Sequence, residues 1–326
     1  MKIQEYTEVL HNRRDPDAGD RIAIIEDLIA FLDDLGISDL SLAGREPMGK
    51  YAKRLMAEGR NTRNNFTYLC DYFDWLKFHK PYIALMEVID CQNAMEVLAD
   101  EIERRHGREI RDFIFGEPVP PLGADEEDRC TYTRAIMEKM SKRLSPEEIR
   151  RAWFQVQHGL SEDFWREGDA ADREKYRQGC GVDALLALKR KERDTYLRSL
   201  HDGDKLWHTI KISDEVLEYV TGDISMEVGR RDGDRIYINK VPYNPTAYAA
   251  ATDPKMKRYY ACHCPMIREA ILHDRPVSPD ICYCSLGHAS HYLAGLGRDL
   301  KGEVLESAVK GDMRCRFVFY LPDDVG

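Results

Sequence analysis

The chain of 326 residues is long enough for about two domains. A hydrophobic content of 43%, with 10% aromatic residues, is typical of a packed globular protein and excludes wholesale disorder. The 58 acidic residues outnumber the 48 basic ones, and the net charge of −10 argues against a general binder of nucleic acid or of an anionic membrane.

The N-terminal sequence MKIQEYTEVLHNRRDPD has no apolar core, and we expect neither a signal peptide nor a membrane span anywhere in the chain. These patterns predict a soluble, cytoplasmic protein. Residues 20–80 then have the spacing of a helical module. Apolar residues recur at intervals of three and four in a helix that ends at Gly36. A second helix is expected before Gly59, and Asn61 or Thr62 is expected to cap a third.

The segment DLGISDL…YAKRLMAEGRNTRNNFTYLCDYFDWLKFHK is similar to the helical, DNA-clasping core-binding domain of tyrosine recombinases. That resemblance implies a DNA-associated regulator. Downstream of this segment we find no His-x-x-Arg followed by the nucleophilic Tyr of a recombinase catalytic domain, and the module is acidic. We therefore expect a helical packing module through which the chain forms a homodimer, and we do not expect nucleic acid as a partner.

Helix is expected to continue over residues 83–112. The stretch FGEPVPPLGADEEDR, residues 115–129, then combines chain breakers with an acidic run. It predicts a domain boundary, with a helical module over 1–118 and a cysteine-rich α+β domain over 119–326.

The second domain is expected to begin with helices and to end with strands. Ser145-Pro146-Glu147-Glu148 has the pattern of a helix start, and residues 161–200 are expected to be helical with a break at Gly179-Cys180-Gly181. Arg231-Asp232-Gly233-Asp234 separates two β-rich runs and predicts a hairpin.

The C-terminal sequence KGEVLESAVKGDMRCRFVFYLP predicts a second hairpin. A two-residue turn at Gly311-Asp312 would place Cys315 opposite Ala308, and Phe317 opposite Glu306. Cys315 is then expected to point inward.

The cysteines are the most informative residues. There are nine, an odd number without a secretion signal, which argues against a disulfide framework. Two C-x-C pairs lie 17 residues apart in the last fifth of the chain. Thiolates are ligands of zinc and of iron–sulfur centres, so we expect zinc, with an iron–sulfur cluster as the alternative. The candidate metal ligands are Cys262, Cys264, Cys282, Cys284 and Cys315.

Two other interpretations of these cysteines remain open, a reactive thiol and an inert core. Cys284 is at a predicted helix start and is the best candidate nucleophile, with His263 as its base or as a replacement for one sulfur ligand. His288 and His291 lie three apart on the same helix, and we favour a partly solvated face for them.

The stretch from YYACHCPMIREAIL to the C-terminal hairpin resembles an uncharacterised prokaryotic cysteine-rich family. That family is related in pattern to the L-2-amino-thiazoline-4-carboxylic acid hydrolases and to 4-vinyl-reductase-type small-molecule-binding domains. The features that carry the resemblance are Cys284 followed by Gly287, and Gly311-Asp312-x-x-Cys315-Arg316-Phe317. The resemblance implies an α/β sandwich with an antiparallel sheet, and this sandwich is expected to bind an apolar or aromatic ligand. In this chain the helical module precedes it.

The vinyl-reductase-like relatives hold zinc with cysteines and a glutamate, and Cys284 and Cys315 match two of those cysteines. This chain has Ser307 where the relatives place another cysteine, and Val304 where their glutamate falls, with Glu303 beside it. The resemblance therefore implies a modified site in which the remaining cysteines substitute.

We expect the chain to bind a small organic molecule at a metal-containing, cysteine-rich site. The alternative is a hydrolase of a C–N or C–S bond, which uses metal-activated water or Cys284, with an acid such as Glu306 as a proton shuttle. No Gly-rich phosphate loop is present, so a nucleotide cofactor is not expected.

Overall fold

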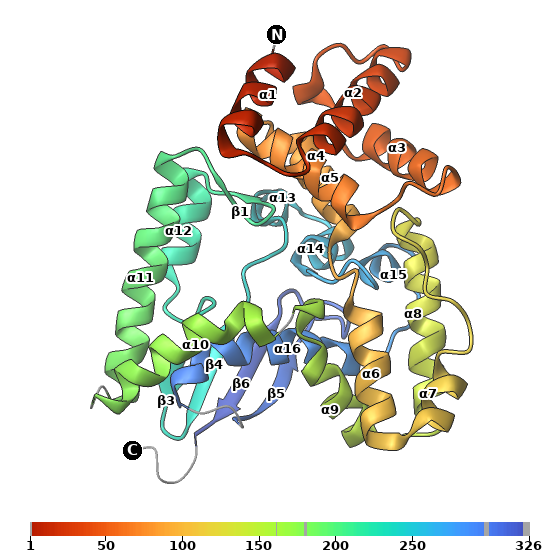
Figure 1. Cartoon of the computed structure of the whole chain (residues 1–326). Coiled ribbons are helices and arrows are strands. Elements are labelled where there is room, and N and C mark those ends of the chain that lie inside the picture. Colours follow the sequence, from red (N-terminus) through yellow and green to blue (C-terminus); the bar gives the residue numbers. More distant parts are fainter. Residues whose placement is uncertain (1, 161, 179–180, 297–299, 322–326) are drawn as a thin grey trace. The chain divides into compact units, whose positions relative to one another are not determined.

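The computed structural model describes residues 2–160, 162–178, 181–296 and 300–321 (Figure 1). The chain divides into two compact units. The N-terminal unit comprises Met1–Gln92 and Pro120–Asp125, and the C-terminal unit comprises Asn93–Val119 and Glu126–Gly326. This division differs from the predicted boundary at 118/119, because α6 (Ala94–His106) packs against α9 (Pro146–Val156).

The N-terminal unit is built of helices. They are α1 (Lys2–Arg13), α2 (Ala18–Asp34), the 3₁₀ turn η1 (Leu40–Leu42), α3 (Arg45–Ala57), α4 (Arg63–Leu76) and α5 (His79–Ile89). The predicted ends are confirmed at two places. Gly36 follows α2 with a φ of +74°, and the Thr62 hydroxyl accepts a 3.2 Å hydrogen bond from the Asn65 N–H at the start of α4.

The continuous helix expected over 83–112 is instead three helices, α5, α6 and α7 (Arg108–Ile114). The breaks lie at Cys91, with a φ of +56°, and at Gly107, with a φ of +84°. Both backbone angles are left-handed and incompatible with a continuing α-helix.

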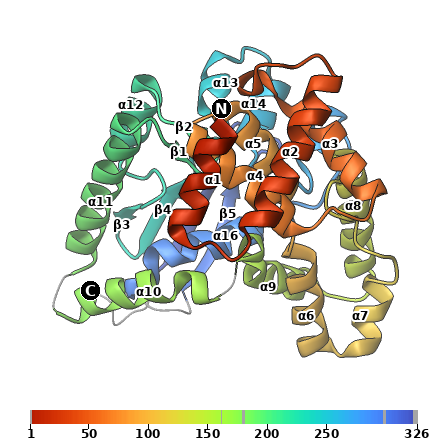
Figure 2. The same cartoon turned by 45° about the horizontal axis from the view of Figure 1, so that its top comes forward.

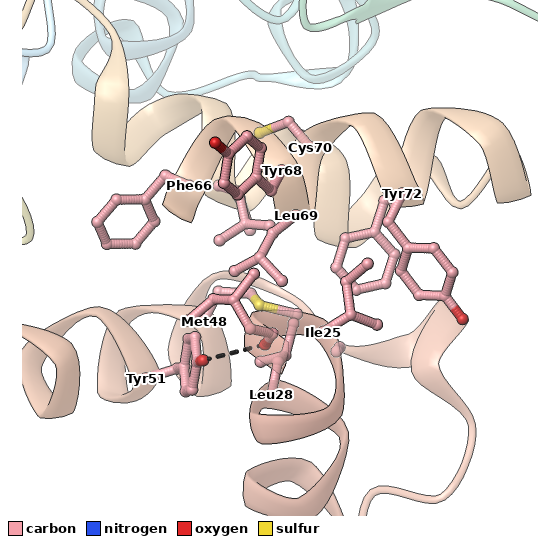
Figure 3. Close-up of a cluster of buried hydrophobic side chains, with 14 of the residues drawn as sticks. Ile25, Leu28, Met48, Tyr51, Phe66, Tyr68, Leu69, Cys70 and Tyr72 are labelled. Atoms are coloured by element: carbon pink, nitrogen blue, oxygen red, sulfur yellow. Dashed lines mark hydrogen bonds between the residues drawn. The ribbon is translucent and has the colours of Figure 1, made fainter. Parts of the chain in front are cut away.

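Apolar and aromatic side chains fill the core of the N-terminal unit (Figure 3). Leu28 of α2, Tyr51 of α3 and Leu69 of α4 are fully buried there. Tyr51 also brings a hydroxyl group to this layer, and that hydroxyl donates to Asp27 at 2.8 Å. Burial and the Asp27 carboxylate both raise the pKa of Tyr51, so the phenol stays neutral.

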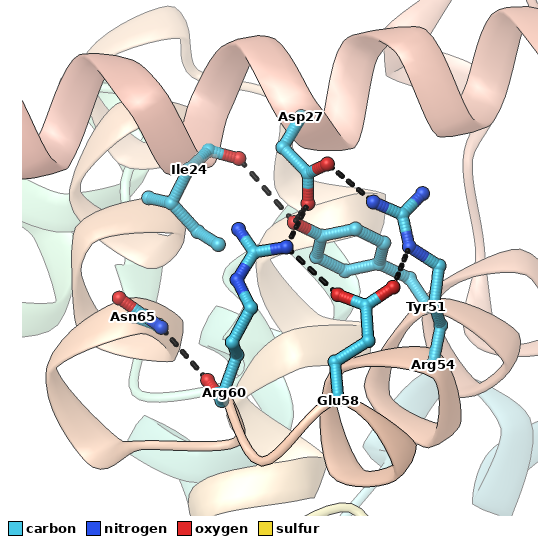
Figure 4. A network of polar contacts seen from close by, with 7 residues as sticks. All are labelled: Ile24, Asp27, Tyr51, Arg54, Glu58, Arg60 and Asn65. Carbon is cyan, nitrogen blue, oxygen red and sulfur yellow. Dashed lines mark hydrogen bonds and ion pairs between the residues drawn. The ribbon is translucent and has the colours of Figure 1, made fainter.

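Around Tyr51, four charged residues form a closed network at the edge of this core (Figure 4). Asp27 pairs with Arg54 and, at 3.3 Å, with Arg60. Glu58 pairs with the same two arginines, at 3.1 and 2.8 Å. Each carboxylate is therefore matched by two guanidinium groups, which fixes α3 against α2.

The C-terminal unit is mixed. After α6 and α7 its helical elements are α8 (Glu126–Ser141), α9, η2 (Gln157–Gly159), α10 (Glu162–Arg177), α11 (Val182–Asp202), α12 (Asp214–Gly222), α13 (Pro245–Ala250), α14 (Pro254–Ala261), α15 (Arg268–Leu272), η3 (Pro279–Cys282), α16 (Tyr283–Ser290) and η4 (His291–Leu296). Its strands are β1 (Leu206–Trp207), β2 (Ile210–Lys211), β3 (Arg230–Asp232), β4 (Arg235–Asn239), β5 (Lys301–Glu306) and β6 (Arg316–Tyr320).

Several predicted features of this unit are confirmed. Ser145 and Glu148 form a reciprocal capping box at the start of α9. The charged segment forms α10 and α11, while Gly179 and Cys180 lie outside the described residues. β3 and β4 pair as the expected hairpin, with Asp232 opposite Arg235.

A four-stranded antiparallel sheet in the order β3-β4-β6-β5 organises this unit. Figure 1 labels its four strands, and Figure 2 shows β3 and β4 after a turn of the molecule. Side chains of α11 and α16 pack with inward residues of the sheet, such as Ile236, Phe317 and Phe319. The α+β class is therefore confirmed. No helix among the described residues has the length and apolar character needed to cross a membrane.

The predicted register of the C-terminal hairpin is wrong. Phe317 lies opposite Val304, and Glu306 lies opposite Arg316, with a bulge between Val304 and Glu306. The connection is longer than two residues, because the Asp312 carboxylate accepts the Ser307 N–H at 2.9 Å and closes a loop between the strands. This loop displaces the pairing that a tight Gly311-Asp312 turn would give.

Candidate functional site

The predicted cysteines meet at one place in the C-terminal unit. A cavity of about 20 Å³ is lined by Cys262, Cys264, Cys282, Cys284 and Cys315. His263 lines the same cavity, and so do three polar residues that the sequence analysis did not single out, His158, Lys240 and Ser285. Residues from five separate segments of the C-terminal unit therefore contribute to this cysteine cavity.

Element ends place these sulfur atoms. Cys262 follows the last residue of α14, and Cys264 lies in the turn before α15. Cys282 ends η3, and Cys284 is the second residue of α16, as predicted for a helix start. Cys315 immediately precedes β6, where its carbonyl accepts the N–H of Lys240 at 3.0 Å.

Proline and capping residues explain why these elements end where they do. Asp253 caps α14 and Pro254 is its first residue. Pro265 restricts the backbone of Cys264 to extended conformations, so the helix cannot continue. Ser278 caps η3 in the same way, and its hydroxyl accepts the Asp280 N–H at 3.3 Å.

Burial keeps most of these thiols protonated. It raises the pKa of Cys262 to about 12, and it raises the pKa values of Cys264 and Cys282 well above the usual thiol range. Neighbouring thiols add to the effect, since a charge on Cys262, Cys282 or Cys284 would repel one on Cys264. The pKa of Cys315 is also raised by burial. Without a cation, these sulfurs are neutral.

Ser307 lies directly against the cysteines. Its side chain is fully buried, and its hydroxyl accepts the Cys282 S–H at 3.4 Å. Cys282 therefore places its sulfur beside Ser307 from a different segment of the chain.

His263 presents one nitrogen with a fixed role. Its Nε2 lies 2.6 Å from the carbonyl oxygen of Val241, which can only accept, so Nε2 carries the proton and Nδ1 is the basic nitrogen. Burial and the charge of Lys240 lower the pKa of His263 well below the usual imidazole range. A neutral imidazole with one nitrogen held by a backbone carbonyl is the form in which histidine ligates metals.

His158 is the imidazole nearest Cys284. Gln157, His158 and Gly159 all have left-handed backbones, with φ of 46°, 62° and 76°. This run directs the His158 N–H to the Cys284 Sγ at 3.1 Å and places its Nδ1 4.0 Å from the same sulfur. The Ser285 hydroxyl lies 3.3 Å from its Nε2. An isolated Gln-His-Gly gives no sequence motif, which is why His158 was missed.

His288 and His291 are packed on Trp165 of α10 instead of forming a solvated face. The His291 ring stacks on the indole at 4.3 Å, and the His288 ring meets it edge-on at 4.8 Å. His291 also contacts the buried Asp169 carboxylate at 3.0 Å. Burial lowers the pKa of His288 well below its usual range.

A buried carboxylate, that of Glu227, is connected to His263 through the peptide groups of Val241. Glu227 is 5% exposed and accepts the Val241 N–H at 2.7 Å, while the carbonyl of the same Val241 accepts from His263. Glu227 also raises the pKa of Tyr292, which burial already places well above its usual range. The sequence offered no motif for Glu227, because its acceptor role depends on the fold.

The candidate proton shuttle Glu306 is held away from the cysteine cavity by arginines. Arg314 donates to its carboxylate at 2.8 and 3.0 Å. This bidentate contact lowers the pKa of Glu306. Neither Glu306 nor Glu303 lines the cysteine cavity.

Comparison with protein-family models, with curated proteins and with solved structures finds no match. The chemistry therefore has to be argued from the cavity. Five thiols and two imidazoles surround a space of about 20 Å³, which suits one ion or one water molecule. As placed, no three Cys, His, Asp or Glu side chains of the described residues converge closely enough to hold a metal. Ligation would therefore require these side chains to move closer together.

Proposed function

We propose that the C-terminal unit is a metal-binding, small-molecule-binding domain whose cysteine cavity holds a zinc ion. The observation that carries this proposal is the meeting of all five predicted cysteines around one ion-sized space. Soft sulfur donors with a neutral imidazole match the preference of zinc. An iron–sulfur cluster needs more room than this cavity of about 20 Å³ gives, so zinc is favoured.

The proposed ligands are the thiolates of Cys262, Cys264, Cys282 and Cys315. The Cys284 sulfur already accepts the His158 N–H, so it is assigned outside this set. A bound zinc would stabilise the deprotonated thiols and tie together the ends of α14, η3 and β6. Lys240, which lines the same cavity, would balance part of the negative charge of four thiolates.

Metal analysis of anaerobically purified protein tests this proposal. We expect about one zinc per chain, its loss in Cys282→Ser and Cys315→Ser, and its retention in Cys284→Ser. Cys130→Ser is the matched control, since Cys130 is a fully buried thiol of the same unit that does not line the cavity. Circular dichroism of each variant separates loss of metal from loss of fold. Wild-type protein that contains no zinc and takes none up would overturn the proposal.

The hydrolase alternative is favoured by one specific observation. Cys284, His158 and Ser285 are arranged as nucleophile, base and orienting group. The Cys284 sulfur would attack the carbon of a C–N or C–S bond, and its proton would pass to His158 Nδ1 while Ser285 holds Nε2. The C–N or C–S bond would then break, and His158 would return the proton to the leaving amine or thiol. Water would hydrolyse the covalent bond to Cys284 and restore the free thiol. His158 rather than His263 lies beside Cys284, so the base assigned here is His158.

Thiol counting separates the two proposals. The hydrolase predicts a single fast-reacting thiol toward iodoacetamide, which disappears in Cys284→Ser and slows in His158→Gln. The zinc site predicts protection of Cys262, Cys264, Cys282 and Cys315 that a chelator removes. Pairing of two chains through the helical module, and contact with DNA, stay predictions that sedimentation and retention on duplex DNA at moderate salt would test.

A further inference from the structure

The cysteine cavity leaves no room for an organic ligand, but a second hollow of the C-terminal unit does. A groove of about 500 Å³ lies between α8, α9 and residues 276–280. That volume is within the range of small-molecule sites, whereas the cysteine cavity has about 20 Å³. We call it the α8–α9 groove.

Apolar side chains make the floor and wall of this groove. Met137 of α8, Leu144, Ile149 of α9 and Val277 line it, and the first three are at most 8% exposed. An apolar surface of this kind fits the hydrocarbon part of a ligand.

Three charged residues line the groove, and two of them already have partners. Asp280 accepts from Arg150 at 2.7 Å, and Glu138 accepts from Lys142 at 2.8 Å. Arg134 is held differently, because its Nε donates to the Pro276 carbonyl at 3.0 Å. Among the described residues, no carboxylate forms a direct ion pair with Arg134, although its charge helps Lys142 to lower the pKa of Glu138.

We propose that the α8–α9 groove binds a small monocarboxylic acid with an apolar body. The carboxylate pairs with the terminal nitrogens of Arg134, whose orientation the Pro276 carbonyl fixes. The hydrocarbon part lies over Met137, Leu144 and Ile149. The inference locates the organic ligand of the proposed domain, and it does not require the metal.

Ligand-observed NMR on the full chain tests this proposal. The probes are aliphatic and aromatic monocarboxylates from benzoate to decanoate, each compared with its amide. We expect at least one acid of the panel to bind and its amide to bind more weakly. Arg134→Gln should lower the affinity for the acid by about tenfold or more, because a charge-assisted contact is lost. Arg198→Gln, on the exposed side of α11, is the matched control and should bind as the wild type does.

A second variant covers the case in which Arg134→Gln does not fold. Val277→Glu places a negative charge on the groove wall and should abolish binding of the acids. The proposal is overturned if no acid of the panel binds at millimolar concentration, or if the acid binds equally to wild type and to the folded variant. Repeating the titration on chelator-treated protein distinguishes failure of the zinc proposal from failure of this one.

Discussion

The two units of this chain bury different kinds of side chain. The N-terminal unit buries mainly hydrocarbon and aromatic rings, with the single thiol of Cys70 in that core, and its main charged network pairs each carboxylate with two arginines. The C-terminal unit gathers five thiols and two imidazoles around one small cavity, and it also buries the carboxylate of Glu227, which bonds the peptide that contacts His263. A helical core with matched charges is sufficient for stability, whereas thiols and imidazoles gathered at one cavity have the composition of a functional site.

The largest expected effect comes from Gly287, at the contact between α16 and α9. A Cβ on Gly287 would lie 1.9 Å from the backbone oxygen of Phe154, so Gly287→Ala must separate the two helices that carry Cys284 and lead to His158. We expect a loss of about 3 kcal/mol in the free energy of unfolding, measured with urea.

Gly49→Ala in α3 is the matched control in the other unit. Nothing lies within 4 Å of the added Cβ, so this change should stabilise the protein by about 0.5 kcal/mol. Equal effects of the two substitutions would contradict the close α9–α16 contact.

Low pH should lower the stability of the C-terminal unit more than that of the N-terminal unit. Burial lowers the pKa of His158 from 6.5 to about 3, and burial lowers the pKa values of His263 and His288 as well. Between pH 6.5 and pH 3 the imidazole takes up a proton in the unfolded chain but stays neutral in the folded one. The free energy of unfolding is therefore highest above pH 6.5 and falls as the pH drops toward 3. The C-terminal unit should therefore lose stability from pH 6.5 downward.

Hydrogen exchange measured between pH 7 and pH 4 checks this prediction. Amides of α9 and α16 should lose protection before those of α2 and α4. Earlier loss in the N-terminal unit would be inconsistent with neutral, buried imidazoles in the C-terminal unit.

The smallest effect is expected at Tyr51 in the N-terminal unit. Tyr51→Phe removes one hydrogen bond to Asp27, but Arg54 and Arg60 still pair with that carboxylate. The expected loss is about 1 kcal/mol by urea unfolding. Tyr196→Phe on exposed α11 should leave stability unchanged. A much larger loss at Tyr51 would show that Asp27 depends on the phenol rather than on the arginines.

Local patterns predicted the parts of the molecule that depend on neighbours in sequence. The cap at Asn61 or Thr62 and the helix starts at Ser145 and at Cys284 are of this kind. Each is determined by residues within one helical turn, so a single sequence contains the information.

The missed features depend on tertiary structure. His158 approaches Cys284 only because three successive backbones are left-handed, and Glu227 acts through the peptide of Val241. The C-terminal register failed because the Ser307–Asp312 contact widens the turn. The convergence of the cysteines was predicted from spacing, whereas the groove beside Arg134 had no counterpart in the sequence patterns.

The Arg150–Asp280 ion pair joins α9 to η3, and each of these elements has one end at the groove and leads to the cysteine cavity at the other. If the groove binds an acid as proposed, a shift of Asp280 would reach Cys282 through the short backbone of η3. Thermodynamic linkage makes such coupling reciprocal, since any factor by which an acid in the groove changes metal affinity is the factor by which metal changes acid affinity. Two small sites connected in this way can act as a single sensor with two inputs.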